Sequence, residues 1–463
     1  MNKPTVDLIV IGAGPAGMSA ALEATRHGLS VVVLDEQGSP GGQIYRNIQQ
    51  ADAHSRRVLG DDYQAGAPLV EQFLQCGARY VAGAAIWQVT PQRQVHFIVE
   101  GRAESLHGRH VVIATGAFER PMPIPGWTLP GVMTAGAGQI LLKSAALVPK
   151  GPVVLAGCGP LLYLLAVQYL RAGIAIGALV DTSDHVDLLR AWRTIPAALR
   201  GWRDLLKGLH LLIELKRAGV RHFRGARNLR IDGLAQATAL GFDSGGRRWS
   251  VPASLILLHQ GVVPNTQISW SLRLEHDWSE QQLCWIARRD NRGETSLPGI
   301  FIAGDGGAIG GAPVALLEGR LVGSAIAASA GNVEAQTDAA QYQKALRRQR
   351  AARPLIDALY RPQQQNRIPA DEVIVCRCEE VSAGEIRQHV KLGCLGPNQA
   401  KAFGRCGMGP CQGRLCGLSV TEIIAEQRQV PAAEVGYYRI RSPLKPITLA
   451  QLSAEAPSLQ EHL

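Results

Sequence analysis

The chain has 463 residues, a length that predicts about two to four domains and a large buried core. Hydrophobic residues make up 46% of the chain and charged residues 19%, which excludes an intrinsically disordered protein. The 51 glycines follow no G-X-Y period, so they indicate tight turns and close backbone–ligand contacts rather than collagen. The net charge of +10 comes largely from two Lys/Arg-rich runs, residues 190–230 and 344–367, which carry neither the interleaved aromatic pattern nor the zinc spacing of nucleic-acid modules. We therefore expect no nucleic-acid partner.

Targeting and membrane signals are weak. A buried-strand pattern begins at Asp7, which leaves no room for a signal peptide before it. The longest apolar run, residues 153–170, contains Gly157, Gly159 and Pro160, so it predicts a strand–turn–helix unit rather than a membrane span. The nine cysteines suit cytosolic usage rather than a secreted disulfide framework. We expect a cytoplasmic protein with no transmembrane segment, and attachment to the inner face of the membrane through a complex stays open.

The first segment predicts a compact strand–helix–strand unit, with a strand over Val6–Ile11, a helix from Pro15 to His27 and a strand over Ser30–Leu34. Between strand and helix stands Gly12-Ala13-Gly14-Pro15-Ala16-Gly17, a complete G-x-G-x-x-G motif. Its first glycine permits a tight turn, its second lets the backbone approach a pyrophosphate, and its third allows close helix–strand packing. This unit predicts a dinucleotide site.

Further motifs indicate which dinucleotide, NAD or FAD, this site binds. Asp35 ends the second strand, where a carboxylate can bind ribose hydroxyls, and Glu36 is the second choice. Gly41-Gly42-Gln43 follows that strand, Ala114-Thr115-Gly116 closes a later strand, and Gly304-Asp305 follows another. The order of these markers resembles the flavoproteins with two dinucleotide-binding domains, of the thioredoxin reductase type, and therefore implies FAD.

The same resemblance implies roles for single residues. Asp305 would bond the ribityl and pyrophosphate region of FAD, and the backbone of Ala85 would touch the adenine. The complete set of predicted FAD-site residues is Gly12, Gly14, Pro15, Ala16, Gly17, Asp35, Glu36, Gly42, Gln43, Ala85, Thr115, Gly116, Gly304 and Asp305.

A second strand–helix–strand unit repeats the pattern, with strands over Val153–Ala156 and Ile174–Val180. Its motif starts Gly157-Cys158-Gly159, but Leu162 replaces the third glycine and should push the helix away from the strand. We therefore expect this domain not to bind NAD(P), although Asp181 could hold a ribose and another nucleotide stays open. Cys158 is expected to be a small buried residue. Because neither unit contains C-x-x-C, disulfide reductase chemistry is excluded.

The C-terminal part carries a cysteine module. Cys376-Arg377-Cys378 is followed, after 27 residues, by Cys406-x4-Cys411, and four thiolates suit zinc or a [2Fe–2S] cluster. A C-x-C pair is uncommon in zinc knuckles, and the pattern resembles the [2Fe–2S] domain of bacterioferritin-associated ferredoxin. Cys394 and Cys416 are expected to be bystanders. The predicted ligands are Cys376, Cys378, Cys406 and Cys411.

Several motifs together point to one family. They are residues 41–46, 116–121, 125–127, 129–132, 259–265 and 405–414. These motifs resemble the α (A) subunits of bacterial opine oxidases, D-hydroxyproline dehydrogenases and hydrogen cyanide synthase, and residues 41–46 resemble the hydroxyproline and opine members most.

This resemblance implies an electron-transfer subunit of an amine dehydrogenase. A β subunit resembling D-amino-acid oxidase would oxidise a D-amino acid, cis-4-hydroxy-D-proline first, or an opine. Electrons would then pass, often through an FMN at the subunit interface, to the FAD and cluster of this chain, and a small ferredoxin-like [2Fe–2S] subunit commonly completes the complex. We accordingly predict no catalytic acid, base or nucleophile in this chain.

The predicted fold is α/β, with two Rossmann-like domains of the thioredoxin reductase type and a small [2Fe–2S] domain. Two alternatives stay open: a self-contained NAD(P)H-dependent flavin reductase that feeds a ferredoxin-like acceptor, and a zinc-stabilised scaffold protein. The predicted parts are residues 1–120 with 290–330 for FAD, 121–289 for the degenerate second domain, 331–372 for a helix and linker, 373–430 for the cluster, and 431–463 for a tail.

Overall fold

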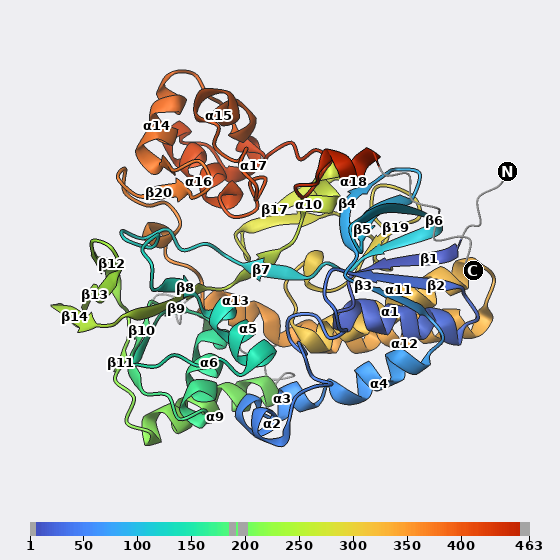
Figure 1. Cartoon of the computed structure of the whole chain (residues 1–463), viewed down its shortest axis with the longest axis horizontal. Helices are drawn as coiled ribbons and strands as arrows, with labels where there is room; N and C mark the ends of the chain where they lie inside the picture. The colour runs from blue at the N-terminus through green and yellow to red at the C-terminus, as the bar shows by residue number, and fades with distance from the viewer. Residues whose placement is uncertain (1–5, 185–190, 193–201, 454–463) are drawn as a thin grey trace.

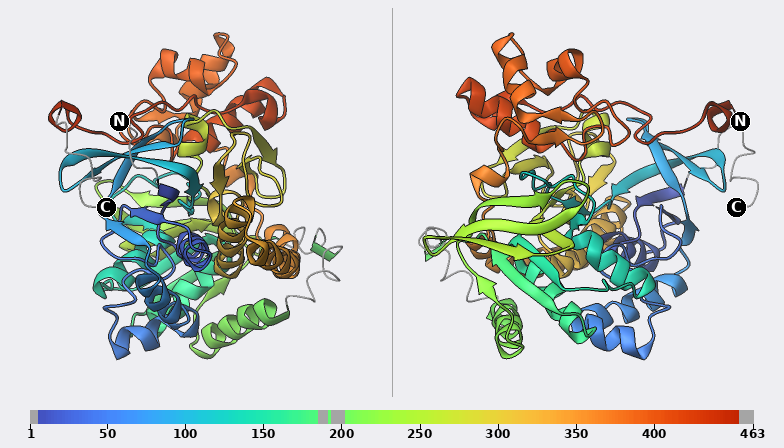
Figure 2. Two further views of the ribbon diagram at one scale, coloured as in Figure 1. Left: turned by 90° about the vertical axis from the view of Figure 1, so that its right-hand side faces the viewer. Right: turned by 60° about the vertical axis from the view of Figure 1, so that its left-hand side comes forward.

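The computed structural model describes residues 6–184, 191–192 and 202–453. Two open sheets lie beside one another, and a helical module rests at one end of the molecule (Figure 1). In both views of Figure 2 this module, coloured orange to red, stays at the same end.

The first sheet has the strand order β3-β2-β1-β6, with β19 on the far side of β6, and these strands run parallel. Every residue of β2 is buried, as expected for a parallel strand covered on both faces. The first half of β6 pairs antiparallel with β5, which pairs with β4. The strands are β1 (Val6–Ile11), β2 (Val31–Asp35), β3 (Arg79–Ala82), β4 (Ala85–Val89), β5 (Gln94–Val99), β6 (Arg102–Ile113) and β19 (Ile300–Ile302).

Helices cover the first sheet, and two of them pack closely because of glycines. A Cβ atom on Gly319 would lie 2.1 Å from the Ala16 carbonyl oxygen, so the return helix α11 can approach α1 only with glycine there. The helices are α1 (Pro15–Arg26), α2 (Ala53–Leu59), α3 (Asp61–Gln64), α4 (Ala67–Gln75) and α11 (Ala312–Ser329), preceded by the 3₁₀ turn η3 (Gly304–Gly306).

The second sheet repeats the parallel arrangement in the order β11-β10-β9-β15-β8. The chain between β11 and β15 forms a separate antiparallel sheet, β12-β13-β14. Its strands are β8 (Val132–Thr134), β9 (Val153–Cys158), β10 (Ile176–Asp181), β11 (His222–Phe223) and β15 (Leu255–Gln260). The remaining elements are α5 (Ala135–Ala145), α6 (Pro160–Arg171), α9 (Trp202–Arg217), β12 (Arg227–Gly233), β13 (Ala237–Ser244) and β14 (Arg247–Pro252).

The chain crosses between the sheets on two paired strands, β7 (Ala117–Glu119) and β16 (Val262–Pro264) (Figure 1). The sequence places residues 121–289 in the second domain, but the apolar side chains between Val263 and Ala287, such as Trp285, are buried in the same core as Ile9 and Val111 of the first sheet. The chain therefore returns to the first domain near residue 262, because β16 pairs with β7, the strand on which the chain leaves that domain. This segment contains α10 (Gln267–Ser271), β17 (His276–Ser279) and β18 (Cys284–Ala287).

The cysteine module shares that core through buried residues such as Val375 and Ile423. Its helix α14 starts with a capping box, in which the Ser382 and Glu385 side chains each accept the other residue's backbone N–H. The module contains β20 (Ile374–Cys376), β21 (Val381–Ser382), α14 (Ala383–Lys391), α15 (Pro397–Gly404), α16 (Gly417–Arg428) and α17 (Ala432–Val435). It is preceded by α12 (Val333–Gln349), η4 (Arg350–Ala352), α13 (Arg353–Leu359) and η5 (Gln364–Asn366) and followed by α18 (Leu449–Ser453).

In the described part of the chain, no helix has the length and apolar character needed to span a bilayer. The long apolar run of residues 153–170 forms strand β9 and helix α6, as the sequence predicts.

Candidate functional site: two nucleotide cradles and a cysteine centre

The first cradle is tightly built at its glycines. A Cβ atom on Gly12 would lie 2.6 Å from the Ala114 carbonyl oxygen, and one on Gly17 would lie 1.8 Å from the Gly12 carbonyl oxygen. Gly14 caps α1, and Pro15 and Ala16 open the helix, whose free N–H groups can face a phosphate. Gly42 lies against Gly14, since a Cβ there would come within 2.8 Å of the Gly14 Cα. These close approaches fit a dinucleotide lying on bare backbone.

Asp35 stands at the end of β2 and holds the turn. Its Oδ2 accepts the backbone N–H of Ala13 at 2.6 Å, and its Oδ1 accepts that of Gln37 at 2.8 Å. Burial raises the pKa of Asp35 above its ordinary value, and the two hydrogen bonds act in the opposite direction. Glu36 is more exposed and pairs with Lys445, and Ala85 follows Ala84, whose N–H bonds the Asp35 carbonyl oxygen at 2.8 Å. Both acids and Ala85 therefore border the same end of the cradle.

The loop after β19 meets the cradle from the other side. A Cβ on Gly304 would lie 2.8 Å from the Ala16 Cβ, and one on Gly306 would lie 3.4 Å from the Gly116 carbonyl oxygen and 3.6 Å from the Thr115 hydroxyl. Asp305 accepts the N–H groups of Gly310 and Gly311 at 2.8 and 2.9 Å, which shapes the loop before α11. Burial raises the pKa of Asp305, against the effect of these bonds. All predicted glycine markers thus border the carboxyl ends of β1, β6 and β19, where this fold binds ligands.

Gln43 lies next to these glycine-rich segments of the first cradle. Its side-chain oxygen accepts from Arg46 at 3.2 Å, and its carbonyl oxygen accepts from the Lys143 ammonium at 3.1 Å. Lys143 belongs to α5, so this hydrogen bond links α5 to the first cradle. Burial lowers the pKa of Lys143 to about 7.

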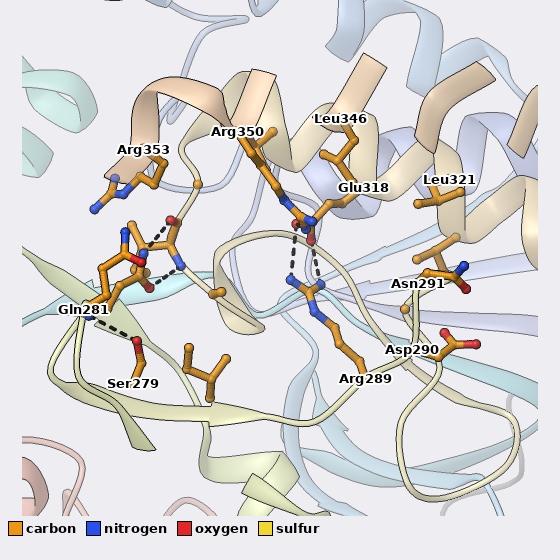
Figure 3. Close-up of a pocket in the computed structure, with 18 of the residues that line it drawn as sticks. Ser279, Gln281, Arg289, Asp290, Asn291, Glu318, Leu321, Leu346, Arg350 and Arg353 are labelled. Atoms are coloured by element: carbon orange, nitrogen blue, oxygen red, sulfur yellow. Dashed lines mark hydrogen bonds and ion pairs between the residues drawn. The ribbon is translucent and has the colours of Figure 1, made fainter. Parts of the chain in front are cut away.

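Glu318 has no role in the sequence-based predictions, yet this residue supports the 304–311 loop. Its carboxylate accepts the Gly304 N–H at 2.8 Å and pairs with Arg289 at 2.6 Å and with Arg350 (Figure 3). Glu318 is 3% exposed, and the two arginines hold its pKa below the ordinary value although burial raises it. A pocket of about 410 Å³ opens beside this network. The sequence does contain one signal for this role, because Glu318 is the single acidic residue in α11, a helix made mostly of small and apolar residues.

We expect Glu318→Gln to weaken FAD retention and to lower the free energy of unfolding by about 3 kcal/mol, because two arginines lose their buried counter-ion. Thermal unfolding and the flavin content after gel filtration measure both effects. The control is Glu334→Gln, because the Glu334 side chain on α12 is 76% exposed. Equal stability and flavin content in the two variants would contradict this role.

The second cradle keeps its close turn but is covered by the chain itself. A Cβ on Gly157 would lie 1.6 Å from the His259 carbonyl oxygen, while Leu162 is fully buried within α6. The Cys158 Sγ, buried as predicted, donates to the Tyr360 carbonyl oxygen at 3.5 Å. The segment after α13 therefore passes over the glycine turn.

The same segment covers the neighbouring strand ends. Gln363 donates to the carbonyl oxygens of Thr182 at 2.6 Å and Ala226 at 3.3 Å, and Gln260 donates to the Asn366 carbonyl oxygen at 3.1 Å. Residues 360–366 thus lie across the carboxyl ends of β9, β10 and β15, where a second nucleotide would bind in this fold. Leu162 alone was the expected obstacle, and the covering segment is a second, independent one.

Asp181, the expected ribose ligand, is also engaged within the protein. It accepts the Tyr163 hydroxyl and the Ser183 N–H, the latter at 2.8 Å, and its Oδ2 lies 3.6 Å from the His222 Nε2. These hydrogen bonds lower the pKa of Asp181, although burial acts to raise it. The Asp181 carboxylate therefore already has its partners within the protein.

We expect NADH to leave the flavin of the purified chain oxidised, because the second cradle is covered. Flavin absorbance in an anaerobic stopped-flow instrument measures this, and reduction by dithionite is the control showing that the flavin can be reduced. Rapid bleaching by NADH would support the self-contained reductase instead.

The cysteine centre brings together five of the nine cysteines. The Sγ atoms of Cys376, Cys406 and Cys416 lie within 4.8 Å of one another. Cys378 and Cys411 lie outside this close group of sulfurs. Burial raises the pKa of Cys378, and so do its hydrogen bond with the Cys411 side chain and the charge of Cys376, so this second pair lies near the first three cysteines. The prediction that Cys416 is a bystander is therefore wrong as regards its position. Cys416 precedes the first turn of α16, and its sulfur lies close to those of Cys376 and Cys406.

Cys394 stands apart from this centre. Its Sγ donates to the Gly396 carbonyl oxygen at 3.3 Å, outside the group of five sulfurs. The prediction that Cys394 is a bystander agrees with this position.

The donor set of the centre fits an iron–sulfur cluster. All five thiols are free, and hydrogen bonds from Cys406 and Cys416 lower the pKa of Cys376 to about 2, so a thiolate is already favoured there. A cluster needs four thiolates, and five are present, so the sequence-based set of Cys376, Cys378, Cys406 and Cys411 has one competitor.

Comparisons with known proteins agree with this architecture. Residues 6–319 match the family described as pyridine nucleotide-disulphide oxidoreductase, and residues 371–456 match the sarcosine oxidase A3 domain. The A subunit of opine oxidase from Agrobacterium tumefaciens (strain Ach5) is 45% identical over 460 residues, which cover 96% of this chain and 91% of that protein. The chain belongs to the family of opine oxidase A subunits.

Two further relatives extend this result. The hydrogen cyanide synthase subunit HcnB of Pseudomonas aeruginosa is 31% identical, with 95% of this chain and 96% of that protein covered. The crystal structure of L-proline dehydrogenase from P. horikoshii has the same fold, with a TM-score of 0.70 and 19% identity over 97% of this chain and 80% of that one. The predicted resemblance to opine oxidase and cyanide synthase subunits and the predicted flavoprotein fold are confirmed.

Two family motifs meet at the junction of the sheets, which the sequence could not show. The His259 Nδ1 lies 2.6 Å from the Glu119 Oε1, and the other Glu119 oxygen accepts the Gly136 N–H at 2.8 Å. His259 is 2% exposed. This pair ties β7, β15 and the start of α5 together, so we assign it to positioning the crossover strands.

Proposed function

We propose that this chain is the electron-transfer subunit of a hetero-oligomeric, flavin-dependent enzyme that oxidises an amine or amino acid. The observation that carries the proposal is the single continuous core that joins the first sheet, whose strands β1 and β6 end at the first nucleotide cradle, to the cysteine module. Two redox sites built on one continuous core suit an electron relay.

The first cradle would hold FAD and the cysteine centre a [2Fe–2S] cluster of the bacterioferritin-associated-ferredoxin type. FAD can take up an electron pair and release it one electron at a time, which suits a one-electron cluster. The chain's own residues would supply the surroundings: the α1 N-terminus would face the pyrophosphate, Asp35 the ribose, and the 304–311 loop the ribityl region. Cys376, Cys406 and Cys416 are buried, which keeps water away from their sulfurs, whereas Cys378 is exposed at the edge of the centre.

Substrate oxidation would take place on another polypeptide of the complex. The relatives are themselves named as subunits, which supports partners, and we propose a β subunit resembling D-amino-acid oxidase together with a small ferredoxin-like subunit. The donor class is a D-amino acid, with cis-4-hydroxy-D-proline first, or an opine. An FMN between subunits belongs to the same proposal, and the cytoplasm is the proposed location.

Co-purification from the native host tests this proposal. We expect two further polypeptides, a flavin and iron in the complex, and dye reduction with one of the D-amino acids or opines in a screen. Purification of a lone chain that contains zinc and no flavin would favour the scaffold alternative.

A further inference from the structure

Four cationic side chains gather beside the cysteine module, although they come from three separate parts of the sequence. Arg273 follows α10, Lys401 lies on α15, and Arg439 and Arg441 lie on the segment after α17. Partial burial, and then the charges of Arg439 and Arg441, lower the pKa of Arg273, while burial, Arg441 and Arg273 affect Lys401 in the same way. Contacts bring these segments together: the Arg439 backbone N–H donates to the Asn398 Oδ1 on α15 at 2.7 Å, and the Trp270 ring of α10 stacks on the Tyr437 ring at 5.4 Å between centroids. We call the four cationic side chains the basic patch.

The patch has no acidic counterpart among the described residues. No carboxylate contributes to the electrostatic surroundings of Arg273 or Lys401, whereas most other buried or clustered arginines pair with one, as Arg289 does with Glu318. Arg273, Arg439 and Arg441 are exposed. Concentrated, uncompensated charge of one sign attracts a partner of the opposite sign and speeds its association.

The basic patch lies one side chain away from the sulfurs. The Lys401 ammonium stands 4.8 Å from the centre of the Tyr438 ring. The Tyr438 hydroxyl donates to the Cys406 Sγ at 3.4 Å and lies 3.7 Å from the Cys416 Sγ. A protein bound to the patch would therefore come close to the cysteine centre.

We propose that the basic patch is the docking surface for an acidic one-electron carrier protein that exchanges electrons with the cysteine centre. The inference rests on the proposed function, since it requires a cluster at those cysteines. One electron passes between the carrier's metal centre and the cluster, so one centre is oxidised as the other is reduced, with no bond made or broken. A nucleic acid is a poorer fit, because its phosphates would match the charge of the patch but it could not exchange electrons with the sulfurs beside it.

The test uses the full chain with its cofactors and an acidic plant-type ferredoxin reduced with one equivalent of dithionite. Stopped-flow mixing measures ferredoxin reoxidation by the oxidised chain. We expect the second-order rate constant to fall with added salt, and to fall by about tenfold or more in Arg439→Glu/Arg441→Glu. The matched control is Arg347→Glu/Arg348→Glu, the same charge change at exposed positions of α12 away from the patch.

Equal rates for the two double variants, or a rate that salt does not change, would overturn the docking proposal. The same holds if the patch variant loses binding to anionic lipid vesicles while its ferredoxin rate is unchanged, which would assign the patch to a membrane. Direct dithionite reduction followed by electron paramagnetic resonance shows separately whether each variant has a cluster. A wild-type chain without iron after reconstitution would instead remove the proposed function, and the docking proposal with it.

Discussion

We expect the iron content of a Cys376→Ser variant to fall to background while its flavin content stays at the wild-type level. Cys376 lies within 4.8 Å of two further sulfurs, and a serine hydroxyl is a poor replacement for a thiolate on iron. The flavin cradle is formed by other residues, at the ends of β1 and β6, and does not depend on this side chain. Metal analysis, electron paramagnetic resonance and flavin release by denaturation measure the outcome.

Cys394→Ser is the matched control, because Cys394 is equally buried but bonds the Gly396 carbonyl oxygen outside the centre. Loss of iron and flavin together, in a variant that still unfolds cooperatively, would show that the two sites are not independent. Comparing Cys406→Ser with Cys416→Ser then identifies the fourth ligand. The sequence spacing predicts that Cys406→Ser loses the cluster, and the reverse result would transfer that role to Cys416.

A second large effect is expected at Gly14. A Cβ atom there would meet nothing closer than the Gly42 Cα at 3.8 Å, and the φ of −78° suits alanine. We therefore expect Gly14→Ala to fold with an unchanged melting temperature but to lose at least about a hundredfold in FAD affinity, because the methyl group would occupy the path of the pyrophosphate. Equilibrium titration of the apoprotein with FAD measures the affinity.

Gly17→Ala is the contrasting variant. Its Cβ would lie 1.8 Å from the Gly12 carbonyl oxygen, so the helix must move and stability should fall by about 1–3 kcal/mol or more. If Gly14→Ala instead binds FAD normally, the first cradle does not hold the pyrophosphate. The two glycines thus separate a ligand contact from a packing contact.

The sequence alone determined the features that depend on neighbouring residues. The first strand–helix–strand unit is found at β1, α1 and β2 within two residues of its predicted bounds, because apolar periodicity and the glycine turn are local signals. The repeat at β9, α6 and β10 was predictable for the same reason, since its strand pattern and glycine turn are also local. The family motifs added the flavoprotein fold and the resemblance to opine oxidase subunits, which the comparisons confirm.

The tertiary structure decided everything that depends on residues far apart in the chain. Cys416 joins the centre because α16 turns it toward Cys376, 40 positions earlier in the sequence, and no short motif encodes that distance. Glu318 reaches Arg289 and Arg350 only when α11 and α12 fold against β18 and its following turn. The segment around Gln363 covers the second cradle about two hundred residues away in sequence. Local patterns report what a segment can form, whereas long-range packing determines which groups it meets.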